Sequence, residues 1–434
     1  MKTVAPRGSG YPPDMKLVAL SLSILSAPFV LASAEDWPGW RGPTANGVSP
    51  SVAPLTWDAE TNVKWRTPLA HPANGSPVVS GDRIFLTTPG DPEGKERALE
   101  CYARETGELL WRRAIDFGRV MPTHDTNPYC GTTPACEGER VVVWHASAGL
   151  YCYDFDGEEL WKRDLGEFKH QWGYGTSPVL RDGMVYLNTG PGEVSMVIAV
   201  DLESGDTVWE AVEPDFRTDE ERKQERLTGS WCTPIIVARD GSSVLVCGQP
   251  TRVVGYDLET GDIVWTCEGV AGKNGNLTYS SPVMADDVCV VIGGYSGPTL
   301  GVRVGGEGDV TESHRVWRHA RQLSNCASGV FVNGRVIVPD MKGTLWCIDP
   351  ATGLPDWKKR VARGGTWGSI LIVDDLLYML AQNGTTIVFH ADAEGLEIVH
   401  ENVIEEATNS TLAIADEEIY LRTHEHLYCI AETR

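Results

Sequence analysis

Short apolar runs of four or five residues recur along most of the chain, and each is followed by a polar turn and a second short run. Three of the clearest first runs are Met196–Val200, Val253–Tyr256 and Leu345–Ile348. Runs of this length, rich in β-branched and aromatic residues and bounded by turn residues, are typical of short β-strands. The pattern therefore predicts an all-β protein built from a series of hairpins.

The hairpin turns carry a repeated phrase. It occurs at Asp201–Trp209, Asp257–Trp265 and Asp349–Trp357, with Ala in place of Asp at Ala103–Trp111 and one residue shorter at Asp154–Trp161. The glycine in each turn supplies the positive φ that a short hairpin loop needs, and the aspartate can accept hydrogen bonds from amides of the turn. The closing tryptophan is large and apolar, so we expect it to pack one sheet against the next.

A second phrase precedes each hairpin and reads as another strand–turn–strand unit. Ser76–Leu86 and Ser177–Leu187 are two copies that open with Ser-Pro. One unit is thus four short strands, and repetition at a period of about 40–50 residues indicates propeller blades. First strands begin near residues 76, 133, 177, 233, 281, 328, 369 and 411, which gives eight blades.

The eighth unit lacks its fourth strand because the chain ends at Arg434. Near the other end, Asn62–Trp65 resembles that strand and has no partner strands before it. We expect it to complete the last blade, since closing the ring removes an open sheet edge. The predicted fold is an eight-bladed β-propeller of four-stranded antiparallel blades over residues 62–434, closed by an N-terminal strand and preceded by a strap over residues 35–61.

Residues 1–34 are interpreted as a secretory signal peptide, with Met15 as an alternative start. A short basic beginning is followed by the mostly apolar Leu17–Leu31, and Ala32–Ala34 fits the cleavage rule. The apolar stretch is short for a membrane span. We therefore predict an exported protein, periplasmic or extracellular, without a membrane span.

The formal net charge is −23, from 37 basic and 60 acidic residues. Nucleic acids and anionic membrane surfaces require a basic face, so neither is predicted as a partner.

The chain has 11 cysteines. Cys101, Cys152 and Cys347 occupy the same place in the third strand of their units, where we expect small buried residues. Cys130 and Cys136 are close enough in sequence to form a disulfide, and both the paired and the free state remain open. The cysteines and histidines show no zinc-site spacing.

The loops that lead into the first strand of each blade, called here the lead-in loops, lie at one mouth of the central channel. A concave mouth of polar and aromatic residues is the default ligand site. The alternative is that the tryptophans fill the channel and the histidines bind loop carbonyls. No catalytic residue and no metal site is assigned. The candidate ligand-binding residues are His124, Asp125, Asn127, His170, Trp172, Tyr279, Asn325, Trp367 and Asn409.

Three other motifs have structural explanations that we favour. His424 and His426 lie two residues apart, which fits half a metal site on a strand but equally a turn between strands. Asp154–Glu158 resembles part of a calcium loop, and its place in the repeat accounts for it. Glu213–Leu227 is a charged insert that we expect to be solvated.

The Asp-x-x-Thr-Gly-x-x-x-Trp phrases, with Ser/Thr-Pro opening many units, resemble the pyrroloquinoline-quinone (PQQ)-type repeat. Trp37–Gly47 is similar to the opening of secreted propellers of this type. The resemblance implies two functional branches. Quinoprotein alcohol dehydrogenases hold PQQ and calcium in the channel beneath a disulfide of adjacent cysteines, whereas BamB-like outer-membrane assembly proteins bind protein partners and hold no cofactor.

This chain has no adjacent cysteine pair and no match to the dehydrogenases' catalytic set, and the lipid-accepting cysteine typical of the BamB-like branch is also absent. We predict a non-catalytic scaffold that binds a protein or a small ligand at the channel mouth, without a cofactor. One alternative is a quinoprotein-type oxidoreductase with PQQ and calcium in the channel. The other is a carbohydrate-binding propeller in which Trp172, Trp231 and Trp367 stack on sugar rings.

Overall fold

Eight four-stranded antiparallel sheets make up the chain from Asp36 onward in the computed structural model. The structure describes residues 1–3, 36–192, 194–239, 241–321 and 323–432. The predicted signal peptide, apart from residues 1–3, lies outside the described residues. Within the described part, no helix is both long and apolar enough to cross a membrane. The eight-bladed β-propeller is confirmed.

The blades follow one another in chain order. From the innermost strand outward, blade 1 consists of β3 (Val78–Ser80), β4 (Arg83–Pro89), β5 (Glu96–Ala103) and β6 (Leu109–Asp116); blade 2 of β7 (Ala135–Glu137), β8 (Arg140–Trp144), β9 (Leu150–Asp154) and β10 (Glu159–Arg163); and blade 3 of β11 (Val179–Arg181), β12 (Met184–Asn188), β13 (Ser195–Asp201) and β14 (Thr207–Glu213). In the same order, blade 4 consists of β16 (Ile235–Arg239), β17 (Ser242–Gly248), β18 (Arg252–Asp257) and β19 (Ile263–Glu268); blade 5 of β21 (Val283–Ala285), β22 (Val288–Ile292), β23 (Thr299–Arg303) and β25 (Arg315–His319); and blade 6 of β26 (Val330–Val332), β27 (Arg335–Pro339), β28 (Thr344–Ile348) and β29 (Pro355–Arg360). Blade 7 consists of β30 (Leu371–Val373), β31 (Leu376–Leu380), β32 (Thr385–Ala391) and β33 (Leu396–Val403), and blade 8 of β34 (Ala413–Ala415), β35 (Glu418–Arg422), β36 (His426–Ile430) and β2 (Val63–Pro68).

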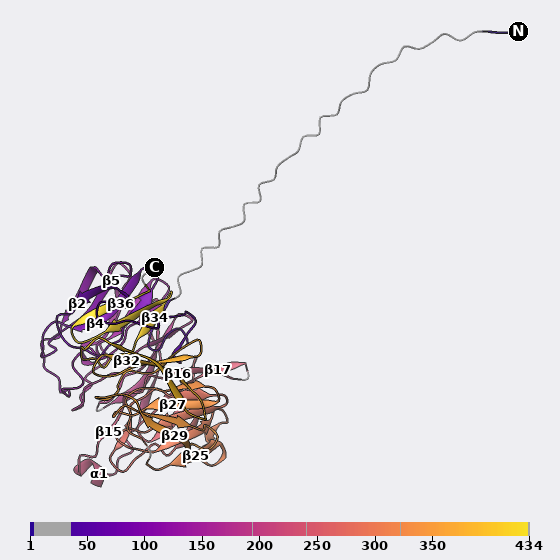
Figure 1. The fold of residues 1–434 in the computed structure, drawn as a ribbon. Coiled ribbons are helices and arrows are strands. Elements are labelled where there is room, and N and C mark those ends of the chain that lie inside the picture. The colour runs from indigo at the N-terminus through magenta and orange to yellow at the C-terminus, as the bar shows by residue number, and fades with distance from the viewer. Residues whose placement is uncertain (4–35, 193, 240, 322, 433–434) are drawn as a thin grey trace. The chain divides into compact units, whose positions relative to one another are not determined.

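The ring closes as predicted. β2 pairs antiparallel with β36, with Trp65 opposite Cys429, and Figure 1 shows the indigo β2 beside the yellow β36. The fourth strand of the last blade therefore comes from the opposite end of the sequence, which closes the ring of blades.

The tryptophan of each repeated phrase joins its blade to the next one. The indole of Trp209 lies on Gly261 in the next blade's turn, and its Nε1 donates to the carbonyl of Leu258 (3.0 Å). A Cβ atom at Gly261 would come within 2.5 Å of that ring. Trp161 repeats the arrangement on Gly205. The phrase is thus a contact between blades as well as a turn within one.

Small residues in the third strand face these tryptophans within the blade. Cys101 is paired with Trp111, Cys152 with Trp161, and Ala199 with Trp209. The indole lying across the strand leaves room only for a short side chain, which explains the recurrence of cysteine there. All 11 thiols are free, including Cys130 and Cys136.

A ring of hydroxyl groups surrounds the channel. In seven links, the backbone N–H of the Ser or Thr before one first strand donates to the Oγ atom of its counterpart in the next blade, over 2.9–3.1 Å. This explains the Ser/Thr position in the second repeated phrase. The links run from Ser76 to Thr133, Thr133 to Ser177, Ser177 to Thr233, Ser281 to Ser328, Ser328 to Ser369, Ser369 to Thr411, and Thr411 to Ser76.

Residues 36–49, called here the channel strap, run inside the ring. Trp37 forms a β-bridge with Val79 of blade 1, and Pro38 accepts a bond from the Cys136 amide of blade 2 (2.7 Å). Farther along, β1 (Val48–Ser49) pairs in parallel with the first strand of blade 7. The strap therefore covers the inner edges of some blades and leaves others facing the channel.

Two irregular stretches lie outside the blade pattern. In the charged insert, α1 (Asp219–Lys223) has no buried residue, and Thr218 caps it. β15 (Thr228–Ser230) then pairs with β20 (Asn276–Thr278), joining the lead-in loops of blades 4 and 5. Before the last strand of blade 5, β24 (Gly308–Asp309) pairs in parallel with β19 of blade 4 and is followed by α2 (Thr311–His314). Blade 2 contains the short 3-10 helix η1 (Ala146–Ala148).

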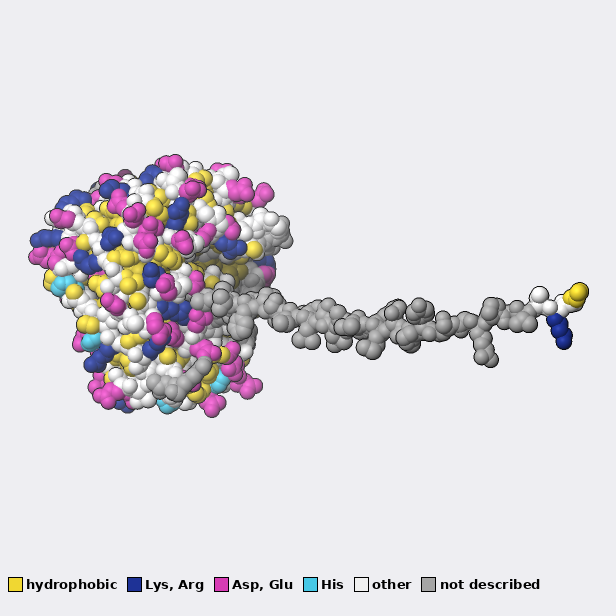
Figure 2. Space-filling model, turned by 90° about the horizontal axis from the view of Figure 1, so that it is seen from above, with side chains coloured by type: hydrophobic (Ala, Val, Ile, Leu, Met, Phe, Trp, Pro, Cys, Tyr) yellow, Lys and Arg dark blue, Asp and Glu magenta, His cyan; other side chains and the backbone are white. Residues whose placement is uncertain are grey.

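On the face seen in Figure 2, acidic and basic side chains are interspersed. This distribution matches the excess of acidic residues in the sequence and shows no broad basic area on that face.

Candidate functional site

The lead-in loops enclose a cavity of about 380 Å³ at one mouth of the channel, which we call the mouth cup. It contains four tryptophans and two tyrosines, and hydroxyls of the ring described above reach its lining. The lining residues are Trp40, Asn74, His124, Thr126, Asn127, Gly131, Trp172, Gly175, Trp231, Thr233, Tyr279, Ser281, Tyr295, Cys326, Ser328, Met341, Trp367 and Asn409.

Trp172 is the centre of an aromatic cluster in the cup. Its ring centroid lies 5.3 Å from that of His170, 5.9 Å from Trp231, 6.0 Å from Tyr279 and 5.9 Å from Tyr295. Burial lowers the pKa of His170 to about 4, so this imidazole is neutral at pH 7. The cluster thus presents flat, uncharged ring surfaces.

Tyr295 is held at the rim of the cup by an unusual turn. It and Ser296, between the second and third strands of blade 5, both have positive φ angles, 54° and 59°. Non-glycine residues seldom adopt this conformation, and Asp416 and Glu417 repeat it in another hairpin turn of this chain. The side chain of Tyr295 is 51% exposed, so it is available to a bound molecule.

Three asparagines fix the loops around the cup. Asn127 Nδ2 donates to the carbonyls of Trp172 (2.8 Å) and Tyr174 (3.0 Å). Asn409 and Asn74 both donate to the carbonyl of Thr126, over 2.9 and 3.1 Å. These bonds tie the lead-in loops of blades 8, 1, 2 and 3 together, so the wall of the cup is preorganised.

The structure brings six of the nine predicted residues into the cup lining: His124, Asn127, Trp172, Tyr279, Trp367 and Asn409. The other three do not line it. Asp125 is exposed on its loop, His170 lies against the rings of Trp172 and Trp231, and Asn325 is fully buried with its amide bound to the Ala327 carbonyl (2.7 Å).

Sequence reasoning missed Trp40, Tyr295, Cys326 and Met341. Tyr295 lies in a turn between second and third strands, which is on the same face as the lead-in loops. That position in the repeat is the signal that would have found it. Trp40 belongs to the channel strap, and nothing in its local sequence places it beneath the cup.

The lining of the mouth cup does not have the chemistry that PQQ and calcium require. The quinone carries several carboxylates, and calcium takes six to eight oxygen ligands that usually include carboxylates. Among the described residues that line the cup there is no Asp, Glu, Lys or Arg. The cup therefore lacks both the cations to pair with the quinone and the anionic ligands for calcium, and these residues do not fit that cofactor.

His424 and His426 are separated by a turn, as we favoured. β35 ends before Thr423 and β36 begins at His426, and the two imidazoles contact different groups. His424 Nε2 lies 3.4 Å from Asn74 Oδ1, whereas His426 Nδ1 lies 3.0 Å from Glu406 Oε1. Ligand atoms of Glu406, Glu425 and His426 lie within 4.8 Å of one another, but hydrogen bonds already occupy both oxygens of Glu406.

Those hydrogen bonds give Glu406 a pH-dependent role. Burial would raise the pKa of Glu406, but bonds from Thr423, Tyr428 and His426 outweigh it and hold the pKa below its usual 4.5. Because the pKa of Glu406 is lower in the folded protein than in the unfolded chain, the ionised carboxylate stabilises the fold at pH values above the unfolded-state pKa. This contribution is lost as the pH falls through the folded-state pKa.

We expect the Glu406→Gln variant to have a lower free energy of unfolding than the wild-type protein at pH 7. The difference in free energy of unfolding between the two proteins should decrease toward pH 3. Urea unfolding of both proteins at pH 7, 5 and 3.5 measures it. A gap that is constant over this range would contradict the assignment of the pKa shift to the folded state.

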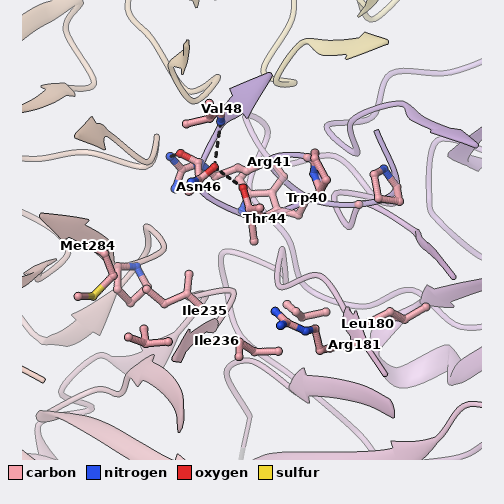
Figure 3. A pocket seen from close by; sticks show the side chains of 18 of the residues that line it. Trp40, Arg41, Thr44, Asn46, Val48, Leu180, Arg181, Ile235, Ile236 and Met284 are labelled. Atoms are coloured by element: carbon pink, nitrogen blue, oxygen red, sulfur yellow. Dashed lines mark hydrogen bonds between the residues drawn. The ribbon is translucent and has the colours of Figure 1, made fainter. Parts of the chain in front are cut away.

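A second cavity, of about 480 Å³, lies at the opposite end of the channel. We call it the lower cavity. Figure 3 shows the strap residues Trp40, Arg41 and Asn46 on one side and Ile236 and Met284 of the inner strands on the other. Trp40 lines both cavities, so its indole lies between them. The strap residue Trp40 is therefore shared by the linings of the two cavities.

The sequence profile of the family described as outer membrane protein assembly factor BamB matches residues 94–359 and 303–430. The chain belongs to this family. The BamB protein of Shewanella oneidensis is 22% identical over 298 residues, which are 68% of this chain and 67% of that protein. The expected relationship to PQQ-type repeat propellers is confirmed.

Solved structures with the same fold come from both functional branches. BamB from Moraxella catarrhalis superposes with a TM-score of 0.57 at 15% identity, covering 85% of this chain and 99% of that one. Quinohemoprotein alcohol dehydrogenase from Comamonas testosteroni gives 0.65 at 12% identity, covering 92% and 81%. At these identities the likeness establishes the fold, and both branches share it.

Proposed function

We propose that this member of the BamB family is an exported, non-catalytic scaffold that binds a protein partner at the mouth cup. The observation that carries the proposal is the lining of the cup. It offers four tryptophans and two tyrosines and, among its described residues, no Asp, Glu, Lys or Arg. Tryptophan and tyrosine are enriched among the few residues that dominate the binding energy of protein interfaces, where they lie in well-packed, desolvated pockets.

The rigidity of the cup supports the same proposal. The hydroxyl ring beneath it and the asparagine bonds around it fix its shape before binding, which lowers the entropy cost of association. The apolar segment at Leu17–Leu31 supports export. Since the relatives are named outer membrane protein assembly factors, we infer that the partner takes part in that assembly.

The test is photo-crosslinking in cells, with p-benzoylphenylalanine in place of Tyr295. We expect a covalent adduct with one protein, and a loss of about tenfold in its yield when Trp172→Ala is added, corresponding to about 1.4 kcal/mol of binding energy. The same probe in place of Val208, which is 50% exposed on an outer strand, is the control and should give no such adduct.

Three results would overturn this proposal. The first is the absence of a protein adduct at position 295, and the second is an adduct whose yield Trp172→Ala leaves unchanged in a protein that melts normally. The third is loss of the adduct on addition of a neutral oligosaccharide. Loss of the adduct with oligosaccharide would favour the carbohydrate-binding alternative, because uncharged rings with nearby amides and hydroxyls also bind sugars.

A further inference from the structure

The lower cavity has an apolar wall that the channel strap leaves uncovered. Leu180 of blade 3, Ile236 of blade 4 and Met284 of blade 5 line it and are only partly buried. By contrast, the first strands of blades 1 and 7, which the strap bridges, are completely buried. A cavity of about 480 Å³ with such a wall has the size and character of a small-molecule site.

Arg41 is the polar group that distinguishes this cavity. It is 2% exposed, and its Nη2 donates to the carbonyls of Asn46 (2.8 Å) and Gly329 (2.5 Å). Its buried Nε has no hydrogen-bond partner, and among the described residues no carboxylate forms an ion pair with it. A buried cation without an anion is costly, so a site beside it favours a negatively charged group.

Two other buried arginines have compensating partners within the protein. Arg104 pairs with Glu418 over 3.3 Å, and Arg97 is surrounded by the rings of Phe117, Tyr129 and Tyr174 at 4.8–5.6 Å. Arg422 is fully buried and, like Arg41, has an Nε without a hydrogen-bond partner, but it lines neither of the two cavities. Arg41 has neither kind of partner among the described residues, and it lines a cavity.

A second cation lies across the cavity. Arg181, at the end of β11, lines the cavity and pairs over 3.3 Å with Asp182, whose side chain is 88% exposed. An exposed pair of this kind contributes little and is easily exchanged. Asp286 also lines the cavity and is exposed, so the charged side chains of the lining are two arginines and one aspartate.

We propose that the lower cavity binds a small amphipathic carboxylate. The carboxylate pairs with the accessible Arg181 in the positive field of the buried Arg41, and the apolar body packs along Leu180, Ile236 and Met284. This site is separate from the mouth cup and does not depend on the proposed function.

Isothermal titration calorimetry with octanoate tests the proposal, with octanamide as the uncharged counterpart of the same length. We expect octanoate to bind at least tenfold more tightly than octanamide, because charge-assisted hydrogen bonds to a guanidinium exceed neutral ones. Arg181→Gln, on an exposed side chain, should weaken octanoate binding several-fold. Trp172→Ala in the mouth cup should leave it unchanged, which separates this test from that of the proposed function.

Ile236→Trp fills the apolar part of the cavity and should abolish binding of octanoate. If that variant melts abnormally, Met284→Trp and Arg181→Gln decide the question. Val208→Ala on the outer strand is the neutral control. The proposal fails if wild-type protein does not bind octanoate, if octanamide binds equally well, or if both wall variants fold and retain full affinity.

Discussion

Replacing Trp209 with alanine is expected to lower the free energy of unfolding by about 3–5 kcal/mol, the usual range for a buried tryptophan. The indole is 7% exposed and lies near the rings of Tyr186 (6.1 Å) and Tyr256 (6.4 Å) as well as on Gly261. The substitution removes packing within blade 3 and between blades 3 and 4, and it leaves the Leu258 carbonyl without the indole donor. Equilibrium denaturation in urea measures the change.

Val208→Ala is the matched control for Trp209→Ala. Val208 is the preceding residue on the same strand, and its side chain is 50% exposed on the outside of the propeller. Surface substitutions of this kind change stability by no more than about 0.5 kcal/mol. A loss below about 1 kcal/mol for Trp209→Ala would show that the repeated tryptophan contributes little to the joining of blades.

The architecture could be predicted from sequence because its signals are local and repeated. The spacing of Asp201, Gly205 and Trp209 defines a turn and a closing strand, and the eight recurring first strands define the ring. The aspartate behaves as expected, since Asp201 Oδ1 accepts bonds from the amides of Glu203 and Ser204. Closure by Trp65 also followed from counting strands.

The candidate site was only partly predictable. Position in the repeat identified the mouth and residues such as Trp172 and Trp367, because all lead-in loops lie on one face. It could not distinguish side chains that line the cup from Asn325, whose amide turns back to its own loop. That choice depends on loop conformation, which repeats do not fix.

The path of the channel strap could not be predicted from sequence patterns. Trp37 and Arg41 bind backbone carbonyls of blades that are distant in sequence, Val79 and Gly329. Such bonds need no particular residue in the partner strand, so they leave no signature there. The sharing of Trp40 by the linings of the two cavities is consequently visible only in three dimensions.

The hydroxyl ring leads to the second prediction. Ser177 Oγ accepts the Thr133 amide over 3.0 Å, and both residues are at most 2% exposed. Ser177→Ala removes the acceptor and leaves that amide buried without a partner, which costs about 1–3 kcal/mol. We expect a loss of this size in the free energy of unfolding, measured by urea denaturation.

The chain itself provides the matched control, because threonine occupies the equivalent position at Thr133, Thr233 and Thr411. Ser177→Thr keeps the acceptor oxygen and should retain most of the stability that Ser177→Ala loses. Equal losses for the two variants would attribute the effect to packing at this position. A smaller loss for threonine would show that the bond between blades, rather than side-chain volume, explains why a hydroxyl opens each blade.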